Sequence, residues 1–548
     1  GARLCLACAE ARQWAVAETH RLMREFKLDY LKHDISPIVT RCNKTGHAHA
    51  HTTDVSYWAT LGYYRVMESL LASFPSLLLE NCSGGGHIKD FGAVRRSHYV
   101  VTTDTLSNLP DRQSIYDSTF ALPPLVLQAY TYNNAYPVEG DDPGSFLWRS
   151  AMMGAWQIDP TDATRWDAEQ IACAGRSAAI YKQWIRPLLA DAKVHHILPR
   201  PDGVHWDGLF EFSASRRKGT LFVFRPDSPE DRQTVRLRGL DPYGSYWIWC
   251  EDGSISAPGQ HTGRELMDEG LVLSLPARYS SDLVYVQDAA AGPAPDLSPP
   301  GAFRILPTKT DSSAFSASAK LRWTASPNAR SYRLRVARNP ELATPMVDTI
   351  RILTETTLED LPAGQPLWWC VSAIGWGGRR DGQIVRLDVP PVTPLPGVAF
   401  LSDMEWAKAT AGAGNPVRRD RNYYDRPLAI GGRKYPKGLW THAFDDATPA
   451  DVVIDIGGKG YGAFVADVGL DDRSGGGSVQ FAVWVDDKVA AESPNLTPRQ
   501  MHRIVVPVSG AHTVTLRVLN GGDGYACDHA VWGLARFIAE GAADPLGE

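Results

Sequence analysis

Leu28-Asp-Tyr-Leu-Lys-His-Asp34 and His98-Tyr-Val-Val-Thr-Thr-Asp104 decide the fold class, because each is a short apolar run that ends in a carboxylate. Similar runs recur along the first part of the chain, at 28–32, 76–80, 98–102, 122–130 and 146–156. Helical patterns separate them, and repeated β-then-α units with buried strands predict a parallel sheet. We therefore expect part of a (β/α)8 barrel, of which about five units are present.

One helix between the first two strands is well marked in the sequence. It shows apolar residues at three- and four-residue steps, namely Tyr57, Leu61, Tyr64, Met67, Leu71 and Phe74. This spacing predicts one buried stripe on a helix. Thr53 and Asp54 precede the stripe as a start signal.

The pattern changes at about residue 195 to alternating strands broken by Gly, Pro and Asp turns, which indicates antiparallel β-structure. Linkers rich in Pro, Ala or Gly follow at 288–300 and 389–396. We expect a multidomain chain in which a partial (β/α)8 TIM barrel is followed by three all-β domains. The expected ranges are 1–192 for the barrel portion, 193–288 for an antiparallel β-sandwich, and 301–393 and 397–540 for two further β-domains.

Charge and hydropathy exclude two classes of partner. The chain has 56 Lys and Arg against 62 Asp and Glu, a net charge of −6, with no long run of either sign. It therefore offers no footprint for nucleic acid. No apolar run reaches the length of a membrane span. The sequence opens with Gly-Ala-Arg, so we expect any export signal to lie upstream and the protein to act outside the cytoplasm.

The eight cysteines do not form a disulfide framework. Cys5 and Cys8 are the one closely spaced pair, and a zinc or redox site there would need a second Cys/His pair at ligand spacing. We expect buried free thiols, no metal and no cofactor. His47-Ala-His-Ala-His51 could bind a metal if it were extended, but a polar loop is the simpler expectation.

Strand alternation places Tyr30, Lys32 and Asp34 on one face, with Asp34 at the C-terminal end, where parallel barrels carry their chemistry. Lys32 on that face would hold the Asp34 carboxylate ionised. The alternative for Asp34 alone is a cap on the following loop. Asp104 ends another strand, and two such carboxylates are what glycoside hydrolysis needs.

The strand between them runs into Ser83-Gly-Gly-Gly86, where missing Cβ atoms allow a ligand to approach the backbone. A phosphate cradle would need a Gly-Lys-Ser/Thr ending or a dinucleotide spacing, and this run has neither.

Four ordered blocks resemble glycoside hydrolase family 36, the α-galactosidases related to melibiase. They are 28–34, 64–70, 74–86, and Thr103-Asp104 with 112–115. The resemblance covers about residues 3–190 and continues weakly to about 288. It implies that Asp34 is the nucleophile and Asp104 the general acid/base of a retaining hydrolase, with carboxyl groups about 5–5.5 Å apart.

The resemblance also implies that Lys32, Cys82, Gly84 and Gly85 line the sugar subsite. The family often has Trp before the nucleophile and Asn two residues after it, whereas this chain has His33 and Ser36. An Arg commonly follows the glycine block, but here the aligned stretch is His87-Ile-Lys-Asp90, so His87 is the residue at the subsite. These departures keep an α-N-acetylgalactosaminidase, or another α-glycosidase of the same clan, open as alternatives.

The last two segments resemble accessory modules. Residues 301–393 are similar to a fibronectin type III module, expected to act as a spacer. Residues 397–540 are similar to the NPCBM carbohydrate-binding domain, also associated with glycosyl hydrolase family 98. The candidates for sugar contact there are Trp440, His442 and Asp528. Trp406 and Trp532 are expected in the core, and a structural calcium near Asp471/Asp472 is an open alternative.

The sequence thus predicts an exo-acting retaining α-galactosidase on oligosaccharides or polysaccharide side chains, with a C-terminal glycan-binding module. The rival of another class is a carbohydrate-binding protein whose barrel remnant has lost catalysis. Because the Asp34 strand corresponds to the family's fourth barrel strand, we expect the chain as given to be catalytically silent. An open five-strand remnant would expose a parallel edge and a strip of core to water.

Overall fold

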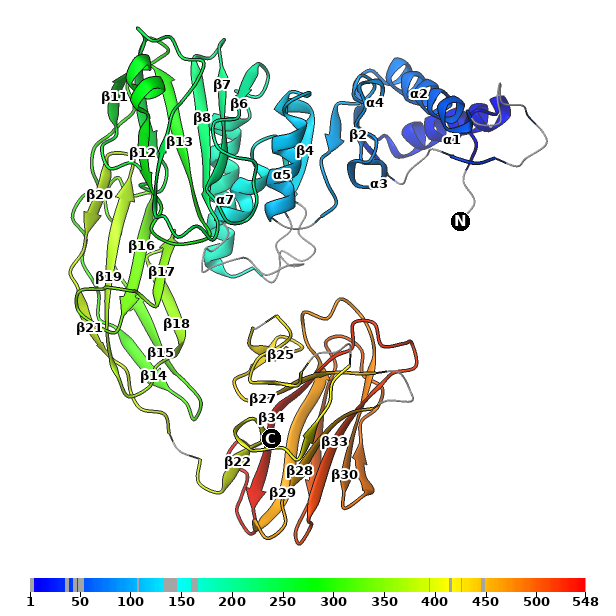
Figure 1. Cartoon of the computed structure of the whole chain (residues 1–548), viewed down its shortest axis with the longest axis vertical. Helices are drawn as coiled ribbons and strands as arrows, with labels where there is room; N and C mark the ends of the chain where they lie inside the picture. The colour runs from blue at the N-terminus through cyan, green and yellow to red at the C-terminus, as the bar shows by residue number, and fades with distance from the viewer. Residues whose placement is uncertain are drawn as a thin grey trace. The chain divides into compact units, whose positions relative to one another are not determined.

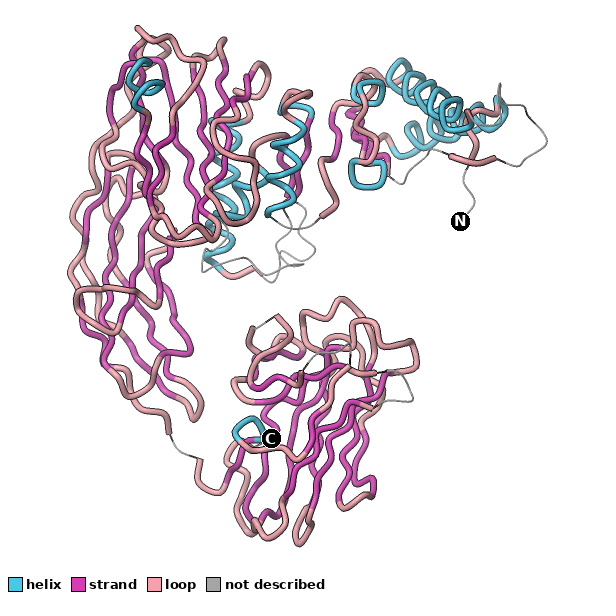
Figure 2. The backbone as a smooth tube through the Cα atoms, viewed as in Figure 1, coloured by secondary structure: helices cyan, strands magenta, loops and turns pink. Residues whose placement is uncertain are grey.

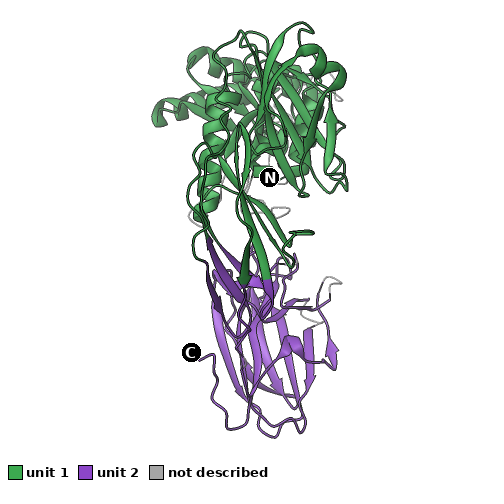
Figure 3. Cartoon of the chain, turned by 90° about the vertical axis from the view of Figure 1, so that its left-hand side faces the viewer, with its two compact units in different colours: residues 1–307, 322–356, 367–387 green, residues 308–321, 357–366, 388–548 purple. Residues whose placement is uncertain are grey.

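The computed structural model describes residues 4–34, 39–42, 47, 54–105, 108–131, 145–158, 166–393, 395–412, 416–424, 426–444 and 449–547. The chain divides into two compact units, which Figure 3 colours separately. The first comprises residues 1–307, 322–356 and 367–387. The second comprises 308–321, 357–366 and 388–548. Each unit is described by itself.

A five-stranded parallel sheet opens the first unit and confirms the predicted partial barrel. Its strands lie in sequence order: β1 (Tyr30–His33), β2 (Leu78–Asn81), β3 (Tyr99–Val101), β4 (Leu127–Thr131) and β5 (Ala155–Ile158). All four neighbouring pairs are parallel, with Lys32 opposite Glu80 and Val101 opposite Gln128. The carboxyl ends of the strands therefore share one edge of the sheet.

Helices connect these strands (Figures 1 and 2). They are α1 (Ala9–Phe26), α2 (Val55–Ser73), α3 (Ser83–Gly86), α4 (Phe91–Val94), α5 (Asn108–Ser118), the 3-10 turn η1 (Pro124–Val126), α6 (Ser145–Ala151), α7 (Ala168–Ile180) and the π-helical turn η3 (Tyr181–Ile185). The expected strand at 146–156 is wrong over its first half, because residues 145–151 form α6 and only 155–158 form β5. All seven residues of α6 are buried, and a wholly buried helix has no polar face to reveal its period.

Helix α2 is confirmed, but its buried face is not the predicted stripe. Met67 is buried as expected, whereas Tyr57 is 60% exposed. The buried residues are Val55, Ala59, Gly62, Tyr63, Val66, Met67 and Leu70. The reason is close packing at Gly62, where an added Cβ would lie 2.0 Å from the carbonyl oxygen of Leu6. Small residues mark this face, and an apolar pattern does not register them.

The antiparallel β-sandwich follows as expected. Its six-stranded sheet has the order β11-β10-β13-β8-β7-β6, and β12 pairs with β9 in a second sheet. The elements are β6 (Ala192–His195), β7 (Asp207–Ser213), β8 (Lys218–Arg225), β9 (Arg232–Val235), β10 (Ser245–Cys250), β11 (Gly259–Thr262), the π-helical turn η4 (Glu265–Glu269), β12 (Leu271–Ser274) and β13 (Ser280–Asp288).

Both faces of the six-stranded sheet are covered. Phe222 and Phe224 of β8 pack into one cluster with Phe146 and Trp148 of α6. On the opposite face of the sheet, Leu221 and its neighbours pack in a second cluster with residues of β9 and β12. The sandwich is therefore continuous with the helical layer of the barrel segment through a hydrophobic core.

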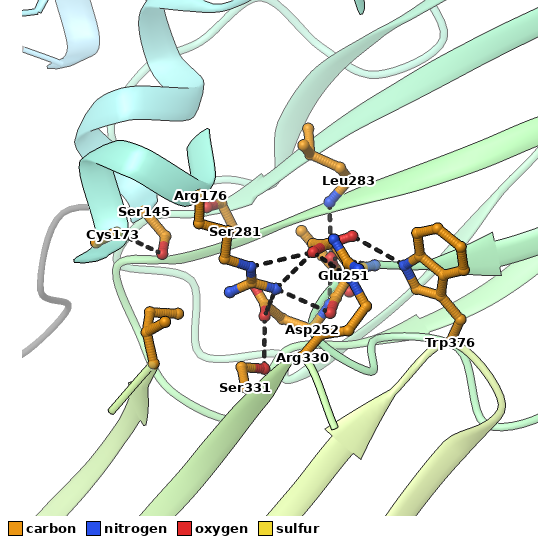
Figure 4. Close-up of polar contacts among 12 residues, drawn as sticks. Ser145, Cys173, Arg176, Glu251, Asp252, Ser281, Leu283, Arg330, Ser331 and Trp376 are labelled. Atoms are coloured by element: carbon orange, nitrogen blue, oxygen red, sulfur yellow. Dashed lines mark hydrogen bonds and ion pairs between the residues drawn. The ribbon is translucent and has the colours of Figure 1, made fainter. Parts of the chain in front are cut away.

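Buried charges reinforce this junction (Figure 4). Arg176 of α7 bonds Glu251 and Asp252 at 2.8 Å each, just after β10. Arg330 bonds the same Glu251 at 2.8 Å, and the Trp376 indole donates to Glu251 at 3.0 Å. One carboxylate pair thus holds together the barrel segment, the sandwich and the part of the third β-region that lies in this unit.

Residues 301–393 form two small antiparallel sheets, one in each unit. The first unit holds β17 (Val347–Arg351), β16 (Ser331–Ala337), β19 (Pro366–Gly375), β20 (Gly378–Asp381) and β21 (Val385–Asp388). The second unit holds β14 (Lys309–Ser312), β15 (Ala317–Arg322) and β18 (Glu355–Leu361). The element bounds overlap the unit boundaries by a residue or two. The fibronectin type III assignment stays a prediction.

A two-sheet β-domain completes the second unit. One sheet has the order β24-β27-β34-β29-β32 with β22 beside β34, and the other the order β23-β28-β33-β30-β31. Its elements are β22 (Val398–Phe400), the 3-10 turn η5 (Leu401–Asp403), β23 (Lys408–Ala409), β24 (Arg418–Arg419), β25 (Leu428–Ile430), β26 (Arg433–Tyr435), β27 (Gly438–His442), β28 (Ala450–Asp455), β29 (Tyr461–Leu470), β30 (Val479–Val485), β31 (Lys488–Glu492), β32 (Met501–Pro507), β33 (Thr513–Asn520) and β34 (His529–Ala539). Trp532 lies fully buried in its core and Trp406 packs against that core.

Among the helices of the described residues, none is long and apolar enough to cross a bilayer.

Candidate active site and aromatic cluster

Asp34 and Asp104 meet the same glycine loop. Asp34 follows β1, Asp104 follows β3, and the loop follows β2, which lies between those strands in the sheet. The backbone N–H of Gly84 donates to Oδ1 of Asp34 at 3.1 Å. A Cβ added to Gly85 would lie 2.5 Å from Cγ of Asp104, so that carboxylate packs directly on the loop. Both carboxylates are exposed.

The loop has a backbone that side chains rarely tolerate. Ser83, Gly84, Gly85 and Gly86 have φ values of 44°, 67°, 71° and 82°. Successive residues in the left-handed region strongly favour glycine. A Cβ on Gly86 would in addition come within 2.3 Å of the Val101 carbonyl oxygen. The glycine run therefore brings the loop against β3 and both carboxylates, which explains its composition without a phosphate.

Lys32 lies on the predicted face of β1 and bonds residues of two other strands. Its Nζ donates to the Tyr130 hydroxyl at 2.6 Å and lies 3.4 Å from Oε1 of Glu80. Tyr130 in turn donates to Glu80. Leu31 and His33, on the other face, pack toward α2. Glu80 and Tyr130 were not singled out from the sequence, although Glu80 alternates with Cys82 and is the register partner of Lys32.

Cys82 is buried near both carboxylates. Burial is the main cause that raises the pKa of its thiol to about 12, and the Asp34 hydrogen bond and the Asp104 charge add to the rise. Lys32 acts in the opposite direction. The sulfur lies 3.9 Å from Oδ1 of Asp104. Cys82 therefore stays a neutral thiol at the base of the candidate subsite.

The residues that follow the glycine loop differ in their exposure to solvent. His87 is exposed at the end of α3. Lys89 turns inward, its Nζ donating to the Thr102 carbonyl at 2.7 Å, and burial lowers its pKa. His33, the last residue of β1, also has its pKa lowered by burial. Ser36, His49 and His51 lie outside the described residues, so a site of three imidazoles stays a prediction.

The C-terminal domain carries a cluster of rings on β27, β34 and the loop before β25. Tyr423 packs 5.5 Å from Trp440 and 5.7 Å from His529, measured between ring centroids. His442 lies 5.0 Å from His529. Tyr423 and Tyr424 are 39% and 40% exposed, so their rings reach solvent. Neither tyrosine was identified from the sequence, although two adjacent tyrosines in a polar loop are a visible signal.

The expected sugar contact by Trp440 requires correction. Its ring is 0% exposed and packs among Leu428, Ile430 and Tyr435, so it supports the cluster from below. His442 is 6% exposed and Asp528 is 0% exposed. His442 packs against His529 in the cluster, whereas the Asp528 carboxylate accepts from the Ser478 N–H at 3.2 Å, and the contact of these two residues with sugar stays a prediction.

Both carboxylates near the expected calcium position accept hydrogen bonds, and one of them has a further buried oxygen. Asp471 accepts from Asn422 and from the Arg473 N–H through Oδ1, while its buried Oδ2 has no hydrogen-bond partner among the described residues. Asp472 accepts from the Gly432 N–H at 2.7 Å. This buried Oδ2 of Asp471 is suited to bind a cation, but calcium needs six to eight oxygen ligands. Calcium remains a proposal.

Comparison with known proteins assigns family models to three segments. Residues 3–188 match Melibiase, 212–286 match the glycosyl hydrolase family 36 C-terminal domain, and 397–538 match the NPCBM/NEW2 domain. The α-galactosidase C of Emericella nidulans is 27% identical over 293 residues, which cover 52% of this chain and 36% of that relative. The chain thus spans little more than a third of the length of the curated relatives it matches.

Two solved structures are also similar. One is the GH36 α-galactosidase AgaA of Geobacillus stearothermophilus in complex with raffinose, with 20% identity, a TM-score of 0.46, and coverage of 52% of this chain and 39% of that chain. The other is the CBM51 of a Clostridium perfringens GH95 protein in complex with methyl-galactose, with 29% identity, a TM-score of 0.24, and coverage of 26% and 99%.

Proposed function

Because the chain combines a melibiase segment, a family 36 C-terminal domain and an NPCBM domain, we propose that it belongs to a retaining exo-α-galactosidase. The observation that carries the proposal is the meeting of Asp34 and Asp104 on one glycine loop, from strands on either side of β2. The substrate would be a terminal α-galactoside of an oligosaccharide or polysaccharide. We propose that it acts outside the cytoplasm.

In the first step the Asp34 carboxylate attacks the anomeric carbon, and Asp104 donates its proton to the departing oxygen. This forms a galactosyl ester on Asp34 and releases the aglycone. Water then attacks the same carbon, Asp104 takes its proton, and the ester bond breaks, so configuration is retained. The Gly84 N–H favours the ionised form of Asp34, because a hydrogen bond to a carboxylate stabilises its charge.

Two features fit a neutral sugar at this site. Cys82 stays a thiol, so it adds no charge between the carboxylates. Lys32 is held by Glu80 of β2 and Tyr130 of β4, which fixes its ammonium group at the base of the subsite. Lys32 can then donate to a sugar hydroxyl from a fixed position, and fixed donors lose little entropy on binding.

The C-terminal ring cluster supports a glycan-binding role for the second unit. Exposed Tyr423 and Tyr424 offer flat apolar faces next to the His529 ring, and His442 packs on the other side of His529. A ring face with a few polar groups is the usual way a protein holds a small polar ligand.

The test of the catalytic proposal is Asp34→Ala in a polypeptide whose parallel sheet is closed into a complete barrel. Turnover of an aryl α-galactoside should be lost, and azide should restore part of it by attacking from the vacated side to give a β-galactosyl azide. Asp29→Ala is the matched control, since Asp29 precedes the same strand at its other end. Retention of most activity by Asp34→Ala would end the assignment, and preferred turnover of an aryl α-N-acetylgalactosaminide would favour the alternative substrate.

A further inference from the structure

Two thiols and an imidazole meet beside the N-terminal segment, and these groups differ in chemistry from the two carboxylates of the candidate active site. The sulfurs of Cys5 and Cys42 and a ring nitrogen of His47 all lie within 4.8 Å of one another. Sγ of Cys42 is 3.5 Å from Nε2 of His47. Cys5 is buried and packs with Val39, Val55 and Ala59, against which Cys42 also lies. Three ligands of the two types that structural zinc prefers, thiolate and imidazole, therefore converge at one point.

The spacing is that of ligands around one metal ion. With Zn–S near 2.3 Å and Zn–N near 2.0–2.1 Å, tetrahedral ligand atoms lie about 3.6 Å apart for S···N and about 3.8 Å for S···S. The 3.5 Å between Cys42 and His47 agrees with the first value. The Cys5–Cys42 and Cys5–His47 ligand atoms lie within 4.8 Å of each other, so they need to move closer by no more than about 1 Å to reach tetrahedral spacing.

Cys8 is the candidate for a fourth ligand, because its spacing from Cys5 is that of paired metal-binding cysteines. It follows Cys5 by three residues, and its N–H donates to the Cys5 carbonyl at 3.1 Å, which makes a tight turn. Its thiol now donates to Glu10 at 3.0 Å. Rotation of the Cys8 side chain would exchange Glu10 for a metal ion.

We propose that Cys5, Cys8, Cys42 and His47 bind one Zn²⁺ in a closed, structural Cys3His site. Three thiolates and an imidazole favour zinc over calcium or magnesium, which prefer oxygen. This proposal departs from the sequence expectation of no metal, because Cys42 and His47, five residues apart, lie beside Cys5 and offer a second Cys/His pair. They were overlooked because the two halves of the site are separated by α1 and β1.

The consequence of the site is local. The ligands join the segment before α1 to the segment that follows Asp34. Among the described residues, the apolar cluster there has four buried members, Cys5, Val39, Val55 and Ala59. So small a core gives little stability, and small cores are commonly supplemented by a metal. Zinc would therefore fix the stretch that leaves the nucleophile strand.

The test uses the full chain, purified with a thiol reductant and without chelator. Metal analysis should find about one zinc per chain, since four protein ligands complete a structural site. Replacement by Co²⁺ should give the sulfur-to-cobalt absorption of a tetrahedral thiolate site. Cys42→Ser and His47→Ala should each weaken zinc binding by more than about tenfold, because even outer-shell changes cost that much. Cys527→Ser and His20→Ala are the controls, since both residues lie elsewhere in the chain.

Thiol alkylation of the unmutated chain keeps the proposal testable if a variant fails to fold. Zinc should protect Cys5, Cys8 and Cys42 from iodoacetamide, and chelator should expose all three while leaving the reactivity of exposed Cys527 unchanged. Absence of metal after reconstitution, a Cys5–Cys42 disulfide in its place, or equal cobalt spectra in the ligand and control variants would overturn the site. If iodoacetamide alkylates Cys8 to the same extent with and without zinc, its assignment as the fourth ligand would be overturned.

Discussion

Gly85 is the residue at which the candidate active site is most tightly constrained. Its φ of 71° disfavours any side chain, and a Cβ would meet the Asp104 carboxylate at 2.5–2.7 Å. Gly85→Ala should therefore displace the acid/base and lower kcat by about 100-fold, since a shift of about 1 Å can cost that much. Gly175→Ala is the matched control, because nothing lies within 4 Å of the added methyl group on α7. Near-normal kcat for Gly85→Ala in steady-state assays would contradict the packing of Asp104 on this loop.

Asp528 and His529 predict opposing pH effects on the stability of the C-terminal domain. Burial, aided by the Asp523 charge, raises the pKa of Asp528 from 3.8 to about 7. Stability from this group is therefore fully present below pH 3.8 and is lost as pH rises through 7. Burial and His442 lower the pKa of His529 from 6.5 to about 4, so its contribution is present above pH 6.5 and is lost as pH falls toward 4.

The two effects oppose each other between pH 4 and 6.5, so single substitutions should separate them. Asp528→Asn should give a domain that gains stability as pH rises across this range. His529→Gln should give the reverse slope, and either slope should approach about 1.4 kcal/mol per pH unit. Urea unfolding at several pH values measures both slopes relative to the unchanged domain. Equal slopes in the two variants would refute the opposing assignment.

At the residue scale, the sequence identified candidate residues at strand ends and missed those located inside strands. Asp34, Asp104 and the glycine run follow strand ends, where alternation and turn chemistry can be read. Glu80 and Tyr130 became partners of Lys32 only through the register of three strands. Trp440 was taken for a surface ring because a strand does not reveal which face a second layer will cover.

At the scale of elements, the junction between α5 and β7 depends on one buried ion pair. Arg112 and Asp207 are each 1% exposed and bond at 2.8 and 3.2 Å. Burial raises the pKa of Asp207 to about 6 even with Arg112 beside it. Arg112→Ala would leave that carboxylate buried without its cation, so it should lower the free energy of unfolding by about 3–5 kcal/mol.

Arg200→Ala is the matched control for this junction. Arg200 pairs with Asp117 of the same helix at 2.8 Å, but both side chains are half exposed. Its loss should lower the free energy of unfolding far less than the loss of Arg112, because water solvates the remaining charge. Denaturant unfolding of the two variants compares them directly. A similar cost for both would show that burial of the Arg112 pair has no special role.

The presence of a helix or strand at a given place in the chain was easier to predict than which of the two forms there. The parallel strands were recognised from β-branched apolar runs, but α6 was taken for a strand because all of its side chains are buried. On α2 the helix was correct and the buried face was displaced, since Ala59 and Gly62 pack closely without contributing to an apolar stripe. Tertiary contacts therefore decided what local periodicity could not.

At the scale of the whole molecule, the C-terminal β-domain should function on its own. Its core is a continuous cluster between two sheets, formed by strands of residues 397–547. Expressed alone, this range should bind galactose-containing glycans and hydrolyse none. Tyr423→Ala should abolish binding on a glycan array, whereas Val505→Ala, an exposed change on β32, should leave it intact. No signal above background for the unchanged domain would refute a glycan-binding role.

The succession of a parallel barrel segment and antiparallel β-structure was the most predictable feature of the chain. The change from buried strands to alternating strands near residue 195, and the proline-rich linkers, are signals of composition that do not depend on tertiary contacts. The buried contacts of Arg176 and Arg330 with Glu251 could not be predicted, because these residues are widely separated in sequence and become neighbours only after the parts fold. The same separation concealed Cys42 and His47 from Cys5.

The central claim is that Asp34 forms a covalent bond to galactose. It is tested most directly by trapping that ester with 5-fluoro-α-galactosyl fluoride, which slows the second step more than the first. The experiment needs a polypeptide in which the parallel sheet is closed into a complete barrel, followed by proteolysis and mass spectrometry. We predict one fluorogalactosyl group per chain, on the Asp34 side chain, and no labelling in Asp34→Ala. Stoichiometric labelling of Asp104 or Glu80, or inactivation that leaves Asp34 unmodified, would contradict the account.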